Sequence, residues 1–156
     1  MRKRISAHVR QCAMSENAWL NLESLVEVEI SSEDSAHPIE SALLPGVTSG
    51  WRAAEPGDQT IRFLFGHPQQ VRRIWLNFME SERARTQEYV LRWSSDHGRS
   101  FHDILRQQWN FSPPHTINEI EDHYIEIPAA TTLELHIKPD ISGALAFASL
   151  AQMRLA

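Results

Sequence analysis

The sequence contains a single cysteine, Cys12, among 156 residues, so no disulfide can form within the chain. Small extracellular domains are often stabilised by disulfides, and we therefore expect a cytoplasmic protein. Residues 1–10 are basic, as the first part of a signal peptide is, but no apolar run of about 7–15 residues follows them. No stretch approaches the ~18 apolar residues that a membrane span requires. We therefore expect neither a signal peptide nor a membrane span.

Positive charge is also scarce. The chain has 15 Lys and Arg against 20 Asp and Glu, a formal net charge of −5. Domains that bind nucleic acid are usually basic, so we expect no nucleic-acid partner. The 42% hydrophobic and 22% charged fractions are ordinary for a folded protein, and the length fits one domain. We expect an N-terminal extension at 1–18, partly helical or disordered, and a folded domain at 19–156.

The motifs of several enzyme classes are missing. There is no Gly-x-Ser-x-Gly nucleophile motif, no Walker loop and no dinucleotide-binding glycine pattern. Paired acids could cleave a glycosidic bond, and Glu119 and Glu121 form such a pair. Strand alternation would place both on one outer face, open to water. We therefore expect a protein that is not an enzyme.

Metal-binding patterns are equally sparse. The eight histidines show no His-x-x-x-His spacing, and no acidic loop of the EF-hand type exists. We therefore expect no resident metal and no cofactor. Oxygen atoms of residues 32–34 and Glu40 leave calcium open as a weaker alternative.

Most of the chain alternates apolar and polar residues with a period of two. Val26, Val28 and Ile30 alternate with Glu27 and Glu29. The same pattern covers 60–65, 73–78, 89–93 and 133–138, and weaker runs lie at 119–127 and 148–155. Antiparallel strands with one face in the core have this pattern. Only residues 38–44 suggest a helical turn. We therefore predict an all-β antiparallel sandwich of about eight strands.

The predicted connections differ in length. Those at 66–70, 96–99 and 128–131 are short and contain Gly, Pro or Asp, the residues of tight turns. Longer connections are predicted at 32–58, 80–86, 107–118 and 140–147. Because antiparallel neighbours reverse direction, the long connections should gather at one end of the sandwich. Loops clustered on a rigid scaffold are a common place for a binding site.

Three segments resemble discoidin domains, also called coagulation factor 5/8 type C domains. They are Gly50-Trp-Arg with the Gly66-His-Pro68 turn that follows, Tyr89-Val-Leu-Arg-Trp-Ser-Ser-Asp-His-Gly98 with Phe101, and Leu133-Glu-Leu-His-Ile-Lys-Pro-Asp140. The resemblance covers about residues 25–156 and implies a jelly-roll, galactose-binding-like sandwich. It also implies binding of glycans, phospholipid head groups or proteins through parts of 32–58, 80–86 and 107–118. The chain departs from the family in lacking a cysteine pair, and Ala42-Leu-Leu-Pro-Gly-Val47 stands where many members have Asp-Gly.

Two groups of residues in the long loops are candidates for ligand contact. Trp51 could stack on the CH face of a sugar while Arg52 holds a hydroxyl or carboxylate, or Trp51 could simply plug the end of the sandwich. Arg83 and Arg85 could reach an anionic ligand and Gln87 a hydroxyl, or this charged loop could be solvated surface.

A third candidate group, Gln108, Trp109 and Asn110, lies at the entrance of another predicted loop. Amides beside an aromatic ring can bind a polyol. Alternatively, Trp109 belongs to the edge of the core and the amides satisfy loop backbone.

Our first functional hypothesis is a module that binds a carbohydrate or another small polar ligand through the long-loop end. The alternative is an intracellular protein–protein interaction module that uses the same loops or a sheet face, where Trp75 or Tyr124 would point outward. Ligand identity, calcium dependence, oligomeric state and pathway are left open by the sequence.

Overall fold

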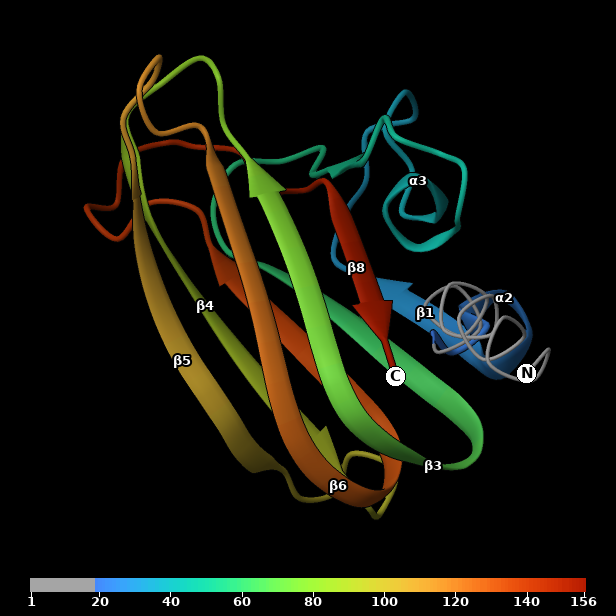
Figure 1. Ribbon diagram of the computed structural model, residues 1–156. Coiled ribbons are helices and arrows are strands. Elements are labelled where there is room, and N and C mark those ends of the chain that lie inside the picture. The colour runs from blue at the N-terminus through green and yellow to red at the C-terminus, as the bar shows by residue number, and fades with distance from the viewer. Residues whose placement is uncertain (1–18) are drawn as a thin grey trace, which may run out of the picture.

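The computed structural model describes residues 19–156, so the predicted extension at 1–18, with Cys12, lies outside the described part. Within it, no helix has the length and hydrophobicity needed to cross a membrane. The predicted antiparallel β-sandwich of about eight strands is confirmed (Figure 1). The described elements are α2 (Leu22–Leu25), β1 (Val26–Ile30), α3 (Glu40–Leu43), β2 (Trp51–Arg52), β3 (Gln59–Met79), β4 (Arg85–Ser94), β5 (His102–Phe111), β6 (Asn118–Lys138), β7 (Ser149–Leu150) and β8 (Gln152–Leu155).

The two layers of the sandwich share two long strands. The first half of β3 pairs with β1 and with the second half of β6, and the layer continues through β4 to β5. The second half of β3 pairs with the first half of β6 and with β8 to form the other layer. Figure 1 shows β3 and β6 curving round together at one end of the molecule. Each of these strands therefore passes from one layer into the other.

The segments 66–70 and 128–131 differ from the short connections that we expected. They are corners inside β3 and β6, and Gln69 lies opposite Ala130 where the register shifts. A β-bulge follows the corner in β3, because the backbone N–H groups of Arg72 and Arg73 both donate to the carbonyl of Ala156, at 2.6 and 2.9 Å. Such a bulge places two residues opposite one and bends the strand.

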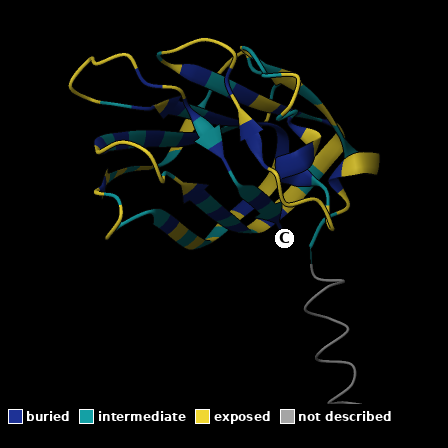
Figure 2. Cartoon of the chain, turned by 90° about the horizontal axis from the view of Figure 1, so that it is seen from above, coloured by how far each residue is buried: buried dark blue, intermediate teal, exposed yellow. Residues whose placement is uncertain are grey.

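Inward-facing apolar side chains fill the space between the layers. Figure 2 shows buried and exposed residues alternating along the strands, as the period of two predicts. In β3 the inward residues have odd numbers before the corner and even numbers after the bulge. The largest fully buried side chains include Trp51, Phe63, Phe78, Tyr89 and Phe111.

The expectation that Glu119 points into water is wrong. Glu119 is only 1% exposed, whereas its neighbour Ile120 on β6 is 57% exposed. In the β3–β6 register Glu119 lies opposite Phe78, which faces the core. Residues directly opposite each other share a face of the sheet, so Glu119 points inward with Phe78.

The long connections gather at one end, as expected. In Figure 1 they lie at the top, opposite the corners of β3 and β6. The largest difference in boundaries arises because β5 continues to Phe111 and leaves a connection of 112–117 instead of 107–118; β4 also begins at Arg85, so the connection expected at 80–86 is 80–84. The helical turn predicted at 38–44 is present as α3. The short β2–β7 pair forms a second small sheet among these connections.

Candidate ligand-binding site

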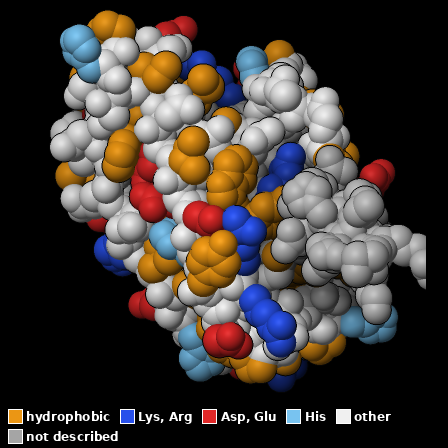
Figure 3. Space-filling model, viewed as in Figure 1, with side chains coloured by type: hydrophobic (Ala, Val, Ile, Leu, Met, Phe, Trp, Pro, Cys, Tyr) orange, Lys and Arg blue, Asp and Glu red, His pale blue; other side chains and the backbone are white. Residues whose placement is uncertain are grey.

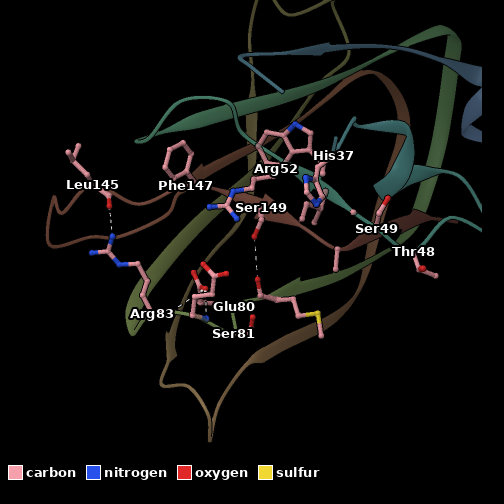
Figure 4. A pocket seen from close by; sticks show the side chains of 16 residues that line it. His37, Thr48, Ser49, Arg52, Glu80, Ser81, Arg83, Leu145, Phe147 and Ser149 are labelled. Atoms are coloured by element: carbon pink, nitrogen blue, oxygen red, sulfur yellow. Dashed lines mark hydrogen bonds between the residues drawn. The ribbon is translucent and has the colours of Figure 1, made fainter. Parts of the chain in front are cut away.

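A pocket of about 460 Å³ opens at the long-loop end of the sandwich. Its lining comes from three segments that are far apart in the sequence: His37 with 48–52, then 79–83, and then 145–151. Figure 4 shows Arg52, His37 and Phe147 on one side of this pocket and Glu80 and Arg83 on the other. Three of the four predicted long loops therefore meet at one place.

The β2–β7 pair fixes the floor of the pocket. Trp51 lies opposite Leu150 and Arg52 opposite Ser149. Gly50 precedes them with φ +71°, and a side chain there would meet the Leu150 carbonyl at 3.0 Å. Because neighbouring strand residues point to opposite faces, Trp51 enters the core while Arg52 points out. The Trp51 indole N–H donates to the Ser32 carbonyl at 3.1 Å.

Arg52 shares one wall with an aromatic ring. Its guanidinium carbon lies 5.1 Å from the centre of the Phe147 ring, within cation–π range. His37 is held nearby, since its carbonyl accepts a hydrogen bond from the Arg52 backbone N–H at 3.2 Å. The His37 ring contacts Asp34 at 3.4 Å. The pKa of Asp34 is lowered, first by the Ala36 N–H that it accepts and then by His37.

The opposite wall is the loop 80–84. Glu80 accepts hydrogen bonds from the backbone N–H groups of Glu82 and Arg83, at 3.0 and 3.4 Å. Its other oxygen accepts from Arg85 Nε at 2.7 Å. Burial alone would raise the pKa of Glu80, but these bonds outweigh it and lower the pKa. The carboxylate therefore stays charged and holds the loop in place.

The loop 139–148 completes the site. Arg83 donates to the Leu145 carbonyl across the pocket mouth (Figure 4). The carbonyls of Ala146 and Ala148 accept from backbone N–H groups of the loop 53–58, each at 2.9 Å. Phe147 between these anchors and Leu145 just before them project outward, at 39% and 75% exposed.

The pocket thus combines an exposed aromatic ring with hydrogen-bonding groups around it. Arg52 offers several N–H donors, His37 an imidazole, and Ser49 and Ser149 hydroxyl groups. Rings bind apolar CH surfaces, and the surrounding donors and acceptors bind hydroxyl or carboxylate groups. This arrangement suits a small polyhydroxylated ligand.

Five of the predicted ligand-contacting residues lie at or just behind this pocket. Arg52 and Arg83 line it with exposed side chains, and Trp51 lines it from the buried side. Arg85 and Gln87 point into the sandwich instead, because they occupy inward positions at the start of β4. Gln87 is fully buried, which leaves it no surface for a ligand in the pocket.

The other three predicted residues lie on the edge strand β5, outside the pocket. Gln108 donates to Glu88 at 2.9 Å, and Asn110 accepts from the Thr86 hydroxyl at 2.6 Å. Trp109 is half-buried and packs against the core. Gln108 and Asn110 therefore link β5 to β4.

His37, Leu145 and Phe147 are pocket residues that the sequence reasoning did not single out. A signal was present for Phe147, since it is the one aromatic residue in a long loop of otherwise small and aliphatic residues, 140–148. His37 lies in the longest predicted loop, for which only Trp51 and Arg52 were predicted to contact a ligand. The predicted loops therefore contain the pocket, and the predicted residues include only part of its lining.

Behind the pocket, a polar cluster lies between the layers. Gln87 accepts from Arg85 and donates to Glu119 at 3.2 Å. Burial, and then the neighbouring Glu121, raise the pKa of Glu119 to about 8. The Tyr89 hydroxyl contacts His123 at 2.9 Å, and burial raises the pKa of this tyrosine. Residues 19–156 contain no group of three or more His, Cys, Asp or Glu side chains that could hold a metal ion.

No protein-family model matches the sequence, and no curated protein matches it at a significant level. Solved structures of carbohydrate-binding modules do match. The family 32 module of NanJ from Clostridium perfringens, solved with galactose, has a TM-score of 0.67 at 14% identity, over 88% of this chain and 96% of that one. A pectin-binding module has a TM-score of 0.62 at 16% identity, over 85% and 90% of the two chains. A chitosan-binding module from a chitosanase/glucanase of Paenibacillus sp. IK-5 has a TM-score of 0.61 at 19% identity, over 88% and 98%.

At these identities the likeness concerns the fold. The chain is a galactose-binding-like β-sandwich, and this is the fold of the family 32 carbohydrate-binding modules. Discoidin domains share that fold, so the resemblance seen in the sequence is confirmed at the level of the fold. Membership of the discoidin family itself stays a prediction.

Proposed function

We propose that this chain is a non-catalytic carbohydrate-binding module that holds a sugar in the pocket at its long-loop end. The exposed Phe147 ring beside Arg52 carries the proposal, because it offers an apolar surface and hydrogen-bond donors in one place. The similar modules described above were solved with galactose or are named for binding pectin and chitosan, which supports the same class of ligand.

The geometry suggests how a sugar ring would bind. Its apolar CH face would lie against Phe147 or Leu145, two exposed apolar side chains of the loop 139–148 that line the pocket. Arg52 and His37 would then direct hydrogen bonds at hydroxyl groups on the ring edge. Both the aromatic contact and these polar contacts are needed to fix the orientation of a small polar ligand.

The carboxyl groups near the pocket argue against hydrolysis of the bound sugar. A glycosidase uses a general acid whose pKa is raised, opposite a second carboxylate. The pKa of Glu80 and that of Asp34 are both lowered, so neither holds a proton at neutral pH. Glu119 does have a raised pKa, but it lies inside the sandwich, away from the pocket lining. Neither Glu80 nor Asp34 therefore has the raised pKa of a general acid.

A glycan-array screen with and without calcium tests the proposal, followed by titration calorimetry with galactose, oligogalacturonate and chitosan oligosaccharides. We expect Phe147→Ala and Arg52→Ala each to weaken binding by at least about tenfold, the usual effect of removing a central contact. Tyr124→Ala is the matched control, since this aromatic residue is 73% exposed on β6 outside the pocket. A folded wild-type protein that binds no glycan would refute the proposal.

One observation favours the alternative, a protein-interaction module. On the outer face of β6, Ile120 and Tyr124 are strongly exposed, and Arg73 stacks on Tyr124 at 5.1 Å. Figure 3 shows hydrophobic side chains scattered among charged ones on this side of the molecule. If this face binds a protein, Ile120→Lys should abolish capture of that partner and leave sugar binding unchanged. If Phe147→Ala abolishes capture of the protein partner instead, the partner binds at the long-loop end.

A further inference from the structure

Arg85 lies beneath the pocket and bonds to both of the loops that form its mouth. Its side chain is 1% exposed. Nε donates to Glu80 Oε1 at 2.7 Å, and Nη1 donates to the Pro139 carbonyl at 2.8 Å. We propose that Arg85 is a positioning residue for the ligand site, one buried guanidinium that fixes the loops 80–84 and 139–148 relative to each other. This inference rests on the proposed function.

The bond to Glu80 determines the shape of the first loop. With one oxygen held by Arg85, the other oxygen of Glu80 faces the backbone and accepts the N–H groups of Glu82 and Arg83. These bonds orient the segment from which the Arg83 side chain extends to the Leu145 carbonyl. Arg85 therefore acts on the pocket-lining Arg83 through the carboxylate of Glu80, which bonds to both residues.

The bond to Pro139 anchors the start of the second loop. Two residues later, the Ile141 N–H donates to the carbonyl of Thr86, the residue after Arg85, at 2.9 Å. At its far end this loop carries Phe147, and the Arg83 bond to Leu145 ties it once more to the first loop. Arg85 therefore bonds to both loops, and Thr86 adds a second bond to the loop 139–148.

The surroundings of Arg85 keep the guanidinium itself in one place. Gln87 accepts a hydrogen bond from Nη1 at 3.1 Å, and the Phe111 ring lies 4.8 Å from the guanidinium carbon. A planar guanidinium can bond to several acceptors in a fixed geometry, whereas a lysine ammonium acts as a point charge on a flexible stem. Lysine at this position would reach Glu80 or Pro139 but would not hold both.

The experiment compares wild type with Arg85→Met, Arg85→Lys and the control Arg92→Met. Arg92 serves as the control because it also pairs with a buried carboxylate, that of Glu134, and does not line the pocket, although its side chain is 36% exposed. Amide hydrogen exchange reports on the loops without any ligand. Calorimetric titration with galactose, oligogalacturonate and chitosan oligosaccharides reports on the site.

We expect Arg85→Met to accelerate exchange at the N–H groups of Glu82, Arg83 and Ile141 by at least about tenfold, because local opening becomes easier. We expect its affinity for the sugar that wild type binds to fall by at least about tenfold. Arg85→Lys should give intermediate values, and it is the informative variant if the methionine variant does not fold. Arg92→Met should change neither these exchange rates nor the affinity.

Each result has a separate meaning. Sugar binding by Arg85→Met or Arg85→Lys at wild-type affinity overturns the positioning role and leaves the proposed function intact. A wild type that binds none of the sugars refutes the proposed function, and the positioning role with it. In that case the exchange rates still show whether Arg85 holds the two loops. Equal losses in Arg85→Met and Arg92→Met would mean that general destabilisation, rather than loop position, explains the effect.

Discussion

Replacing the buried acid Glu119 with glutamine should make the protein more stable at high pH. Burial and the neighbouring Glu121 raise the pKa of Glu119 from 4.5 to about 8. Between these values the folded protein keeps a proton that the unfolded chain releases. The free energy of unfolding therefore falls as the pH rises from about 4.5 to about 8, because the native state binds more protons. Glutamine has the same shape, can still accept from Gln87, and does not titrate.

The size of the effect follows from the pKa values. One pKa unit corresponds to about 1.4 kcal/mol, so the full difference is at most about 5 kcal/mol. Because Glu119 and Glu121 interact, part of this belongs to the pair, and we expect Glu119→Gln to gain roughly 2–4 kcal/mol at pH 8 and little at pH 5. Urea unfolding of both proteins at pH 5, 6, 7 and 8 measures the difference. Glu126→Gln, an exposed position on the same strand, should leave the profile unchanged. Parallel profiles for wild type and Glu119→Gln would show that the folded protein carries Glu119 ionised.

Two glycine substitutions test the scaffold of the pocket, and a third substitution tests a buried carboxylate elsewhere in the sheet. Gly50→Ala should lower the free energy of unfolding by about 1–3 kcal/mol and weaken sugar binding, because the new side chain combines a strained φ with a close approach to the Leu150 carbonyl. Gly57→Ala has a positive φ but open space, so thermal unfolding should show a smaller loss and binding should be retained. Glu134→Gln, at a carboxylate buried between two arginines, should cost about 2 kcal/mol at pH 7. Burial raises the pKa of Glu134, but the two arginines lower it by more, so the net pKa is below its usual value. The stabilisation by the charged carboxylate is therefore lost as the pH falls below about 4.5, and the unfolding curves of variant and wild type should converge in acid.

The strands were predictable because the core imposes a period of two on them. The corners were not, because glycine and proline allow the same backbone angles in a hairpin turn as in a bend within one strand. Only the pairing of β3 with β6 along both halves shows that Gly66 and Pro68 lie inside one strand. That pairing joins residues far apart in the sequence, so the local pattern of apolar and polar residues does not predict it.

The orientation of β6 explains the error at Glu119. Alternation states that Glu119 and Glu121 share a face, but it does not state which face is buried. The register with Phe78, fixed by the strand pairing, places Glu119 inside, and Glu121 lies on the same face with intermediate exposure.

The position of the pocket was predicted at the level of loops and partly at the level of residues. Loop length and strand order indicated the end of the sandwich where the pocket lies, and Arg52 and Arg83 line it; that a ligand binds there stays a prediction. Phe147 was missed because a single aromatic residue among alanines has no periodic partner to mark it. Trp109 was chosen because the strand β5 was expected to end before it, and the strand in fact continues to Phe111. The cytoplasmic location stays a prediction, which cell fractionation would test.

The shared strands also determine when during folding the pocket can exist. Since β3 and β6 each run through both layers, neither layer can assemble without the other, and their pairing joins distant parts of the chain. Such nonlocal topologies fold slowly, whereas the β4–β5 hairpin is local and can form early. The pocket needs residues from 37 to 151, so it is completed only when nearly the whole chain is in place. Sugar binding during refolding would therefore report the last step of folding rather than the first collapse.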